Sequence, residues 1–234
     1  MGQQIAPLVM LGRWNEAAPL AAALLDGDID SDALSGAAYL SQLALARDEP
    51  DLLARCVAMA DERRDSEHVD HWGSAGLVHA RIALECGDTT EAQRLVTELV
   101  ASPTLPAEFV DELLELSIEA GITDGDEQAM AERQAYLDAL RPARYTPLRR
   151  AGSLRLAAER AHLRGDETTA LRAEAEAEAL LRQVGAKPRL AACLLERARR
   201  RGESEPLLEA RTVYGELGAI HWLERVAREF GAVA

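Results

Sequence analysis

Two stretches of the chain read Glu85-Cys86-Gly87-Asp88-Thr89-Thr90-Glu91-Ala92 and Leu163-Arg164-Gly165-Asp166-Glu167-Thr168-Thr169-Ala170. Each contains a glycine, an aspartate directly after it, and an alanine five positions beyond it. Glycine accepts the left-handed backbone conformation that ends a helix. The aspartate can cap the next helix by accepting hydrogen bonds from its free amides. The pattern therefore predicts a turn between two closely packed helices.

The same turn recurs along the chain, with marks at residues 12, 47, 87, 125, 165 and 202. The copy at 47 lacks the glycine, and the copy at 125 fits loosely. A second pattern, Gln183-Val184-Gly185-Ala186, returns as Glu216-Leu217-Gly218-Ala219. Self-similarity at a period of about 35–40 residues is typical of stacked helical hairpins.

The composition supports helices: Ala and Leu dominate the apolar residues, and only nine of 234 residues are aromatic. Strands favour β-branched and aromatic side chains. We therefore expect an all-α fold, a superhelix of about six antiparallel helix pairs. It forms a single helical-repeat domain over residues 1–234, with a bend near 141–148. Helices are predicted at 3–13, 15–26, 32–47, 50–64, 67–86, 89–101, 107–121, 125–141, 147–164, 167–184, 188–201, 205–217 and 220–231.

Particular positions follow from this register. Ala80 and Ala158 should lie where the helices of a pair meet, and Glu91 should complete a capping box with Asp88. The first helix offers little polar cover at Ile5, Leu8, Val9 and Met10. A repeat stack needs a polar cap at its end. We therefore expect the chain to be a segment of a larger protein, or to form a homodimer through that end.

The net charge of −14 is unevenly distributed. Residues 1–140 hold 8 basic against 27 acidic side chains, and residues 141–234 hold 18 against 13. The acidic half should repel nucleic acid and anionic membranes. With three isolated cysteines, no apolar run of membrane-spanning length and no basic leader, the sequence predicts a cytoplasmic protein.

Motifs for chemistry are weak. The acidic run 26–32 departs from the calcium-loop pattern at its sixth and twelfth positions, so we interpret it as a capped turn. Glu67-His68-Val69-Asp70-His71 lacks a third metal ligand at a suitable spacing. No phosphate loop or nucleophile elbow is present. Trp14, Trp72 and Trp222 are expected to pack in the core. We therefore predict no catalytic residue, metal or cofactor.

Two units resemble the tetratricopeptide superfamily, which places a small residue, a glycine and an alanine at set positions of its repeat. These residues are Ala80, Gly87 and Ala92, and Ala158, Gly165 and Ala170. The family's tyrosine is replaced by Ala83 and Ala161, and its tryptophan is absent from these units. The resemblance implies that the all-α fold is a tetratricopeptide-like superhelix of about six antiparallel helix pairs, without the family's peptide clamp.

Residues 150–231 also resemble the helical-repeat segments of LuxR-type ATP-dependent transcriptional activators and ATPase-linked nucleotide cyclases. The resembling stretches are Leu180-Leu181-Arg182-Gln183-Val184-Gly185-Ala186, Leu194-Leu195-Glu196-Arg197-Ala198 and Tyr214-Gly215-Glu216-Leu217-Gly218-Ala219. In those proteins the repeats sense an inducer or hold a regulatory partner.

The tetratricopeptide resemblance implies which residues line the concave groove. Carried over by position from the turn glycines, they are Arg81, Glu85, Arg155, Glu159, His162, Arg189, Glu196, Arg199 and Arg200. From these we predict that an acidic peptide or another anionic ligand docks on Arg155, Arg189 and Arg199. Alternatively, these arginines pair with Glu159, Glu196 and neighbouring acids along their own helices.

The leading functional hypothesis is a non-catalytic interaction or sensor module of a bacterial transcriptional regulator or signalling ATPase. Its partner would be a protein, a peptide or a small inducer, with no direct contact to nucleic acid or membrane. The alternative is an all-helical enzyme whose pocket is not visible as a local motif. Acids, histidines and aromatics converging in one deep pocket would favour the enzyme. A long open groove without perturbed ionisable groups would favour the module.

Overall fold

The structure, a computed structural model, describes residues 2–26, 30–102, 107–140 and 146–231. In these residues the chain forms thirteen α-helices and no strand. The helices are α1 (Gly2–Met10), α2 (Trp14–Leu25), α3 (Ser31–Arg47), α4 (Pro50–Glu62), α5 (Val69–Glu85), α6 (Thr89–Val100), α7 (Ala107–Asp124), α8 (Glu127–Asp138), α9 (Pro147–Leu163), α10 (Glu167–Val184), α11 (Lys187–Arg201), α12 (Ser204–Leu217) and α13 (Ile220–Phe230). The predicted all-α class and the succession of helix pairs are confirmed.

The turn glycines explain where the helices end. Gly87 and Gly165 have φ angles of +80° and +76°, in the left-handed region that glycine tolerates best. At the repeat without a glycine, Asp48 adopts φ +58° and ends helix α3 in the same left-handed conformation. Aspartate is one of the few other residues that enter this region.

The predicted caps are present. Asp88 Oδ1 accepts from the Glu91 amide at 3.0 Å, and Asp166 Oδ1 accepts from the Thr169 amide at 3.1 Å. The predicted return bond from Glu91 to Asp88 is wrong, because the Glu91 carboxylate binds Arg94 instead, at 2.6 Å. In the acidic run 26–32, Asp30 caps α3 through the Ala33 amide at 2.9 Å, while positions 27–29 lie outside the described residues.

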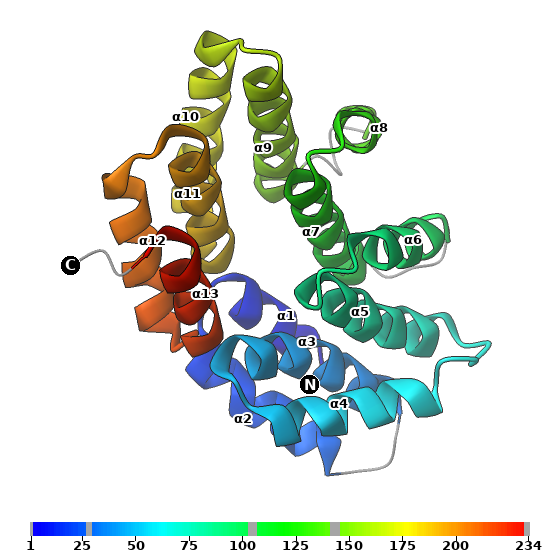
Figure 1. The fold of residues 1–234 in the computed structure, drawn as a ribbon. Helices are drawn as coiled ribbons and strands as arrows, with labels where there is room; N and C mark the ends of the chain where they lie inside the picture. Colours follow the sequence, from blue (N-terminus) through cyan, green and yellow to red (C-terminus); the bar gives the residue numbers. More distant parts are fainter. Residues whose placement is uncertain (1, 27–29, 103–106, 141–145, 232–234) are drawn as a thin grey trace.

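The helix pairs do not form an open stack, because the chain returns to its start. Figure 1 shows the helices following one another around a ring, from α1–α4 through α5–α9 to α10–α13. Helix α13 packs against α3, and α11 touches α1. The predicted bend at 141–148 falls mainly on residues outside the described ones.

Aromatic rings and a tight turn join the two ends of the ring. The Trp14 and Trp222 rings meet edge to face with centroids 5.6 Å apart, and Trp222 also contacts Tyr214 at 5.2 Å. Trp14 is buried, and its indole donates to the Val9 carbonyl at 3.0 Å. The α1–α2 turn at Gly12 lies against α11 and α12. We call this contact region the seam.

The seam corrects one expectation from the sequence. The first helix was expected to leave an apolar face uncovered, but Ile5 and Val9 are 0% and 1% exposed. Val9 and Met10 face the same cavity as side chains of α11 and α13. Helix α1 packs mainly against α2 and α3 and also touches α11, so this face is covered. The homodimer and the larger protein stay predictions.

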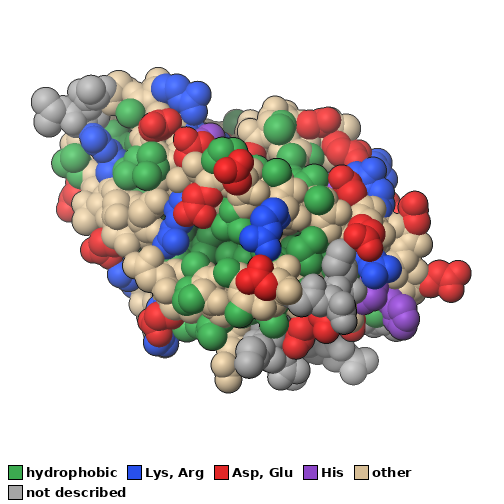
Figure 2. All heavy atoms as spheres, turned by 90° about the horizontal axis from the view of Figure 1, so that it is seen from below, with side chains coloured by type: hydrophobic (Ala, Val, Ile, Leu, Met, Phe, Trp, Pro, Cys, Tyr) green, Lys and Arg blue, Asp and Glu red, His purple; other side chains and the backbone are tan. Residues whose placement is uncertain are grey.

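The core is made of small and medium side chains. Ala80 and Ala158 are fully buried, in agreement with the predicted repeat register. On the side of α2 and α4, Figure 2 shows hydrophobic side chains gathered at the middle of the face, with charged side chains around them. Among the described residues, no helix is long and apolar enough to cross a membrane.

The seam can be tested at Gly12. An added Cβ would lie 2.8 Å from Leu217 Cδ2 and 3.0 Å from Lys187 Cβ, and φ is +74°. Gly165 has a similar φ of +76° but open space around it. Both alanine variants carry the strain of left-handed backbone, about 1–2 kcal/mol. Gly12→Ala should lose roughly 1–3 kcal/mol more, from overpacking.

Urea unfolding of the parent, Gly12→Ala and Gly165→Ala measures this difference. Equal destabilisation of the two variants would show that the seam does not form in solution.

Candidate functional site

A cavity of about 110 Å³ lies at the centre of the ring. Its walls come from seven helices, α1, α3, α5, α7, α11, α12 and α13. Apolar side chains and carboxylates alternate in the lining, which includes Val9, Met10, Gln42, Glu85, Glu112, Glu115, Glu119, Arg189, Leu195, Glu196, Arg199, Tyr214, Trp222, Arg225 and Val226. The two ends of the chain therefore build the cavity together.

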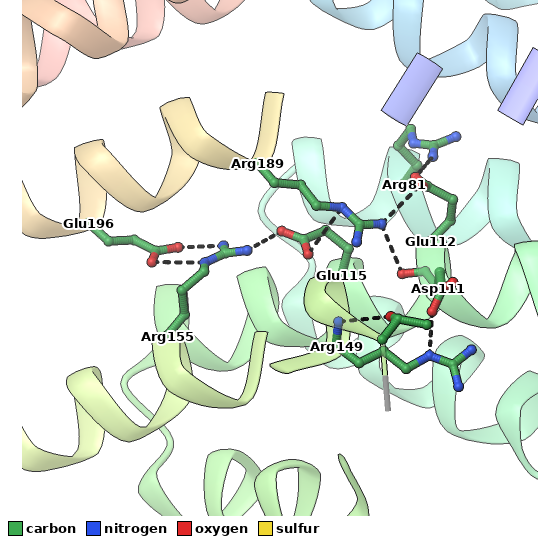
Figure 3. A network of polar contacts seen from close by, with 9 residues as sticks. Arg81, Asp111, Glu112, Glu115, Arg149, Arg155, Arg189 and Glu196 are labelled. Atoms are coloured by element: carbon green, nitrogen blue, oxygen red, sulfur yellow. Dashed lines mark hydrogen bonds and ion pairs between the residues drawn. The ribbon is translucent and has the colours of Figure 1, made fainter. Parts of the chain in front are cut away.

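Charged side chains beside this cavity form a connected network (Figure 3). Arg189 bridges two carboxylates of α7, with Glu112 Oε1 at 3.0 Å and Glu115 Oε2 at 3.4 Å. Arg155 binds Glu115 on one side and both oxygens of Glu196 on the other, at 2.6 and 3.1 Å. Helices α7, α9 and α11 are thus tied together by alternating charges.

Arg81 extends this network to the N-terminal helices. Its guanidinium donates to Glu112 at 3.3 Å, to the Ala38 carbonyl at 2.5 Å and to the Ser41 hydroxyl at 3.1 Å. The network, defined as Arg81, Glu112, Arg189, Glu115, Arg155 and Glu196, runs through α5, α7, α9 and α11 and reaches α3. It contains three guanidinium groups and three carboxylates, so it is neutral as a whole.

Burial makes this pairing obligatory. Arg155 is 1% exposed, and an unpaired charge at such a depth costs several kcal/mol. Burial alone would raise the pKa of Glu115, but Arg155 and Arg189 bring it below its ordinary value. Burial lowers the pKa of Arg155, yet Glu115 and Glu196 raise it well above its ordinary value. Both groups are therefore ionised at neutral pH.

The network joins the two unevenly charged halves of the chain. Glu112 and Glu115 belong to the acidic half, and Arg155 and Arg189 belong to the basic half. Glu85 follows the same rule: Arg225 and His221 approach its Oε2 at 3.7 and 3.6 Å, and the Trp222 indole donates to its Oε1 at 3.2 Å. These ion pairs join the acidic half of the chain to its basic half across the ring.

Glu119 is the exception among the carboxylates that line the cavity. In the described parts of the chain, no hydrogen bond or ion pair reaches it. Burial, followed by the charge of Glu115, raises the pKa of Glu119 to about 8, although Arg155 opposes the shift. Burial and the nearby Glu119 charge also raise the pKa of Tyr214. A titratable carboxyl thus lies in the cavity without a partner.

The residues expected in a groove fall into two groups. Arg81, Glu85, Arg155, Arg189, Glu196 and Arg199 lie in or directly behind the cavity wall. Arg199, which lines the cavity, binds Glu229 Oε2 at 2.6 Å. The arginines proposed for an anionic partner therefore already hold carboxylates. The alternative prediction placed these pairs along single helices. In the structure each pair instead joins two different helices.

The other three predicted residues lie away from the cavity. Arg200 binds Glu159 at 2.5 Å and Glu174 at 2.7 Å, where α9, α10 and α11 meet. His162 Nδ1 lies 2.8 Å from Glu167 Oε1 at the end of the same pair. The Arg200 contacts tie α11 to the preceding helix pair, and the His162 contact joins the two helices of that pair. Docking of an acidic peptide or another anionic ligand on Arg155, Arg189 and Arg199 stays a prediction.

The sequence reasoning missed the contribution of α7. Glu112, Glu115 and Glu119 were not assigned, because the turn at Gly125 matches the repeat only loosely. Their spacing of three and four residues places them on one face of a helix. Apolar residues flank that face on both sides in the sequence. Acids at such spacing in an otherwise apolar helix were the signal for an inner charged face.

Outside this cavity, a second pocket of about 280 Å³ lies between α5 and α6, and its lining includes Asp65, Trp72 and His79. The described residues contain no group of three or more His, Cys, Asp or Glu side chains arranged to hold a metal ion. The His68 and His71 rings are adjacent, with centroids 5.2 Å apart, at the start of α5. Cys56 and Cys193 are buried, and burial raises the pKa of both thiols.

The buried network can be tested on α9, which carries a buried and an exposed arginine. Arg155→Met leaves Glu196 buried without its partner and should reduce the unfolding free energy by about 3–5 kcal/mol. Arg150→Met removes the exposed pair with Glu176 and should cost at most about 1 kcal/mol. Urea denaturation of both variants checks the difference. A similar small loss for both would mean that the Arg155 pairs do not form.

Glu119 predicts a pH dependence. Its folded-state pKa of about 8 lies above the unfolded value. The carboxyl therefore does not lower the unfolding free energy while it is protonated in both states. The penalty grows as pH rises from about 4.5 to 8. Glu119→Gln should therefore match the parent near pH 5 and exceed its stability by about 1–3 kcal/mol near pH 8.

Thermal unfolding at the two pH values measures this, with Glu224→Gln, an exposed residue of α13, as the control for net charge. A stability gain that does not change with pH, or one that Glu224→Gln shares, would place Glu119 in contact with water.

Comparison with known proteins does not assign a family. No family model matches the chain, and no match to a curated protein or a solved structure was found. The description therefore rests on the molecule itself: thirteen helices in the described residues, packed mostly in sequential pairs.

Proposed function

We propose that this protein is a non-catalytic sensor module that binds a small molecule in its central cavity. The observation that carries the proposal is the composition of the cavity wall. Val9 of α1 and Gln42 of α3 line it from one end of the chain, and Tyr214 and Trp222 line it from the other. A ligand there would contact both sides of the seam.

The closed ring favours a small ligand over a peptide. A peptide in the centre would need to separate Arg155 and Arg189 from Glu112, Glu115 and Glu196, leaving buried charges unpaired. The space of about 110 Å³ suits a ligand of few atoms, since an apolar cavity of roughly 150 Å³ holds one benzene molecule. An acidic peptide would have to bind elsewhere on the surface.

Sensing follows from the place of the ligand. A ligand that binds only the closed ring stabilises it by mass action, so occupancy would strengthen the contact between α1–α3 and α11–α13. The outer helices would then present a firmer surface to a partner domain. This agrees with the resemblance to the repeat segments of transcriptional activators and signalling ATPases, in which repeats sense inducers.

An enzyme is the second candidate, and one observation favours it. Acids and aromatics converge in a single pocket, and Glu119, with a pKa of about 8, is suited to proton transfer near neutral pH. Convergence of acids and aromatics in one pocket is the feature expected of an enzyme. We favour binding, because the other lining carboxylates with resolved contacts, Glu85, Glu112, Glu115 and Glu196, are held by cations. None of these four carboxylates is therefore free to act with Glu119 as a second acid or base.

The proposal can be tested with a cavity-filling variant. Ala192 of α11 lines the cavity and Ala175 of α10 is exposed, so Ala192→Phe should fill the space and Ala175→Phe should not. We expect members of a panel of small alcohols, carboxylates and amines to bind the parent and Ala175→Phe in ligand-observed NMR. Ala192→Phe should bind them at least about tenfold more weakly.

Binding that is equal in both variants, or no binding to the parent, would contradict a cavity ligand. The same NMR samples test the enzyme hypothesis: chemical conversion of a panel member that stops in Glu119→Gln would establish catalysis instead.

A further inference from the structure

Three polar groups that line the central cavity lack hydrogen-bond partners in the described residues. They are the Glu119 carboxyl of α7, the Gln42 Oε1 of α3 and the Tyr214 hydroxyl of α12. Of the three residues, Glu119 is partly exposed. Gln42 Oε1 has no contact with solvent, and Tyr214 is only 5% exposed. Buried polar groups are nearly always hydrogen-bonded. Gln42 Oε1 departs from this rule, and the other two groups lie in the wall of the same cavity, so one bound molecule there would satisfy all three.

The three groups share one property: each can accept a hydrogen bond. A carboxylate and an amide oxygen are acceptors, and a phenol oxygen accepts as well as donates. The missing partner must therefore be rich in donors. An alkylammonium group has three N–H donors and no acceptor, which matches the number and the kind of the unpaired groups.

The charge balance at the cavity also favours a cationic ligand. Arg189 is held by Glu112 and Glu115, Arg225 faces Glu85, and Arg199 holds Glu229. The arginines of the lining therefore have carboxylate partners, and one carboxyl, Glu119, is left over. An anionic ligand would have to compete with these internal partners, whereas a cation would neutralise Glu119 without breaking any of them.

We propose that the ligand is a small primary amine, bound as its ammonium ion by Glu119, Gln42 and Tyr214. The Tyr214 and Trp222 rings, 5.2 Å apart, offer apolar and cation–π contacts to the ammonium and to the carbon atoms beside it. The short apolar wall at Val9, Leu195 and Val226 would receive the alkyl part. This inference rests on the proposed function, since it names the chemical class of the cavity ligand.

The protonation state of Glu119 links this binding to pH. The free carboxyl has a pKa of about 8, and only its ionised form would pair with an ammonium ion. Affinity should therefore rise with pH up to about 8 and then level off, while an alkylamine stays protonated, as lysine does. The charged and titratable groups around Glu119 are Arg81 and Glu85 of α5, Glu112 and Glu115 of α7, Arg155 of α9, Arg189, Glu196 and Arg199 of α11, Tyr214 of α12, and His221 and Arg225 of α13.

The test compares isobutylamine, isobutanol and isobutyrate, which share a carbon skeleton but are cationic, neutral and anionic. NMR titration of the full chain at pH 8 should show the amine binding at least about tenfold more tightly than the alcohol, as expected for a hydrogen-bonded charge. Glu119→Gln should remove this preference and the pH dependence between 6 and 8. Glu224→Gln, the control of equal charge, should keep both.

Tyr214→Phe provides a second, milder variant. It should weaken amine binding several-fold through the loss of one acceptor, and it keeps the ring that packs against Trp222. If isobutylamine binds no better than isobutanol, or binds Glu119→Gln as it binds the parent, the amine assignment is wrong. Binding of isobutanol or isobutyrate alone would leave the cavity function standing. No binding by any of the three would count against both proposals.

Discussion

The pairing of Arg155 and Arg189 with the carboxylates of α7 and α11 is the interaction on which the rest of the structure depends. These side chains lie on the inner faces of helices that are about 40 to 80 residues apart in the sequence. Each would be strongly unfavourable if it were buried alone. The helices must therefore meet in the one arrangement that satisfies all of them. That arrangement draws the repeat stack into a ring.

Charge pairing also gives the ring its specificity. Stacked helix pairs bury much the same apolar surface over a range of curvatures, so packing of Ala and Leu side chains alone leaves the closure weakly defined. Polar groups that need particular partners distinguish one arrangement from the others. In this chain, ion pairs join the acidic half to the basic half. The contact between Trp14 and Trp222 at the seam closes the ring.

Local features of the fold could be predicted from the sequence, because they depend on neighbouring residues. Gly87, Gly165 and Asp166 determine turns and caps within a few positions of themselves, and their structure agrees with the prediction. Even Asp48 follows from the repeat period, once the left-handed conformation of an aspartate is allowed. The helices accordingly begin and end within about three residues of the predicted positions.

The closure of the helix stack into a ring could not be predicted in this way. The curvature of the stack accumulates over many repeats, and no local sequence pattern determines it. Ile5 and Val9 therefore looked uncovered, and Arg155 and Arg189 looked available to a partner. The same limit hid the cavity: Gln42, Glu119 and Tyr214 come from three distant helices, and only the ring brings them to one place. A site of this kind is a product of tertiary structure, without a sequence motif of its own.

The central claim is that the two ends of the chain meet, and the aromatic contact at the seam tests it most directly. Nuclear Overhauser spectra of a Trp72→Phe variant would contain two indole systems, Trp14 and Trp222, whose centroids lie 5.6 Å apart in an edge-to-face arrangement. The closed ring predicts cross-peaks between the two indole rings, alongside those between Trp222 and Tyr214. Cross-peaks from Trp222 to Tyr214 without any to Trp14 would show that the helices are folded but the ring is open.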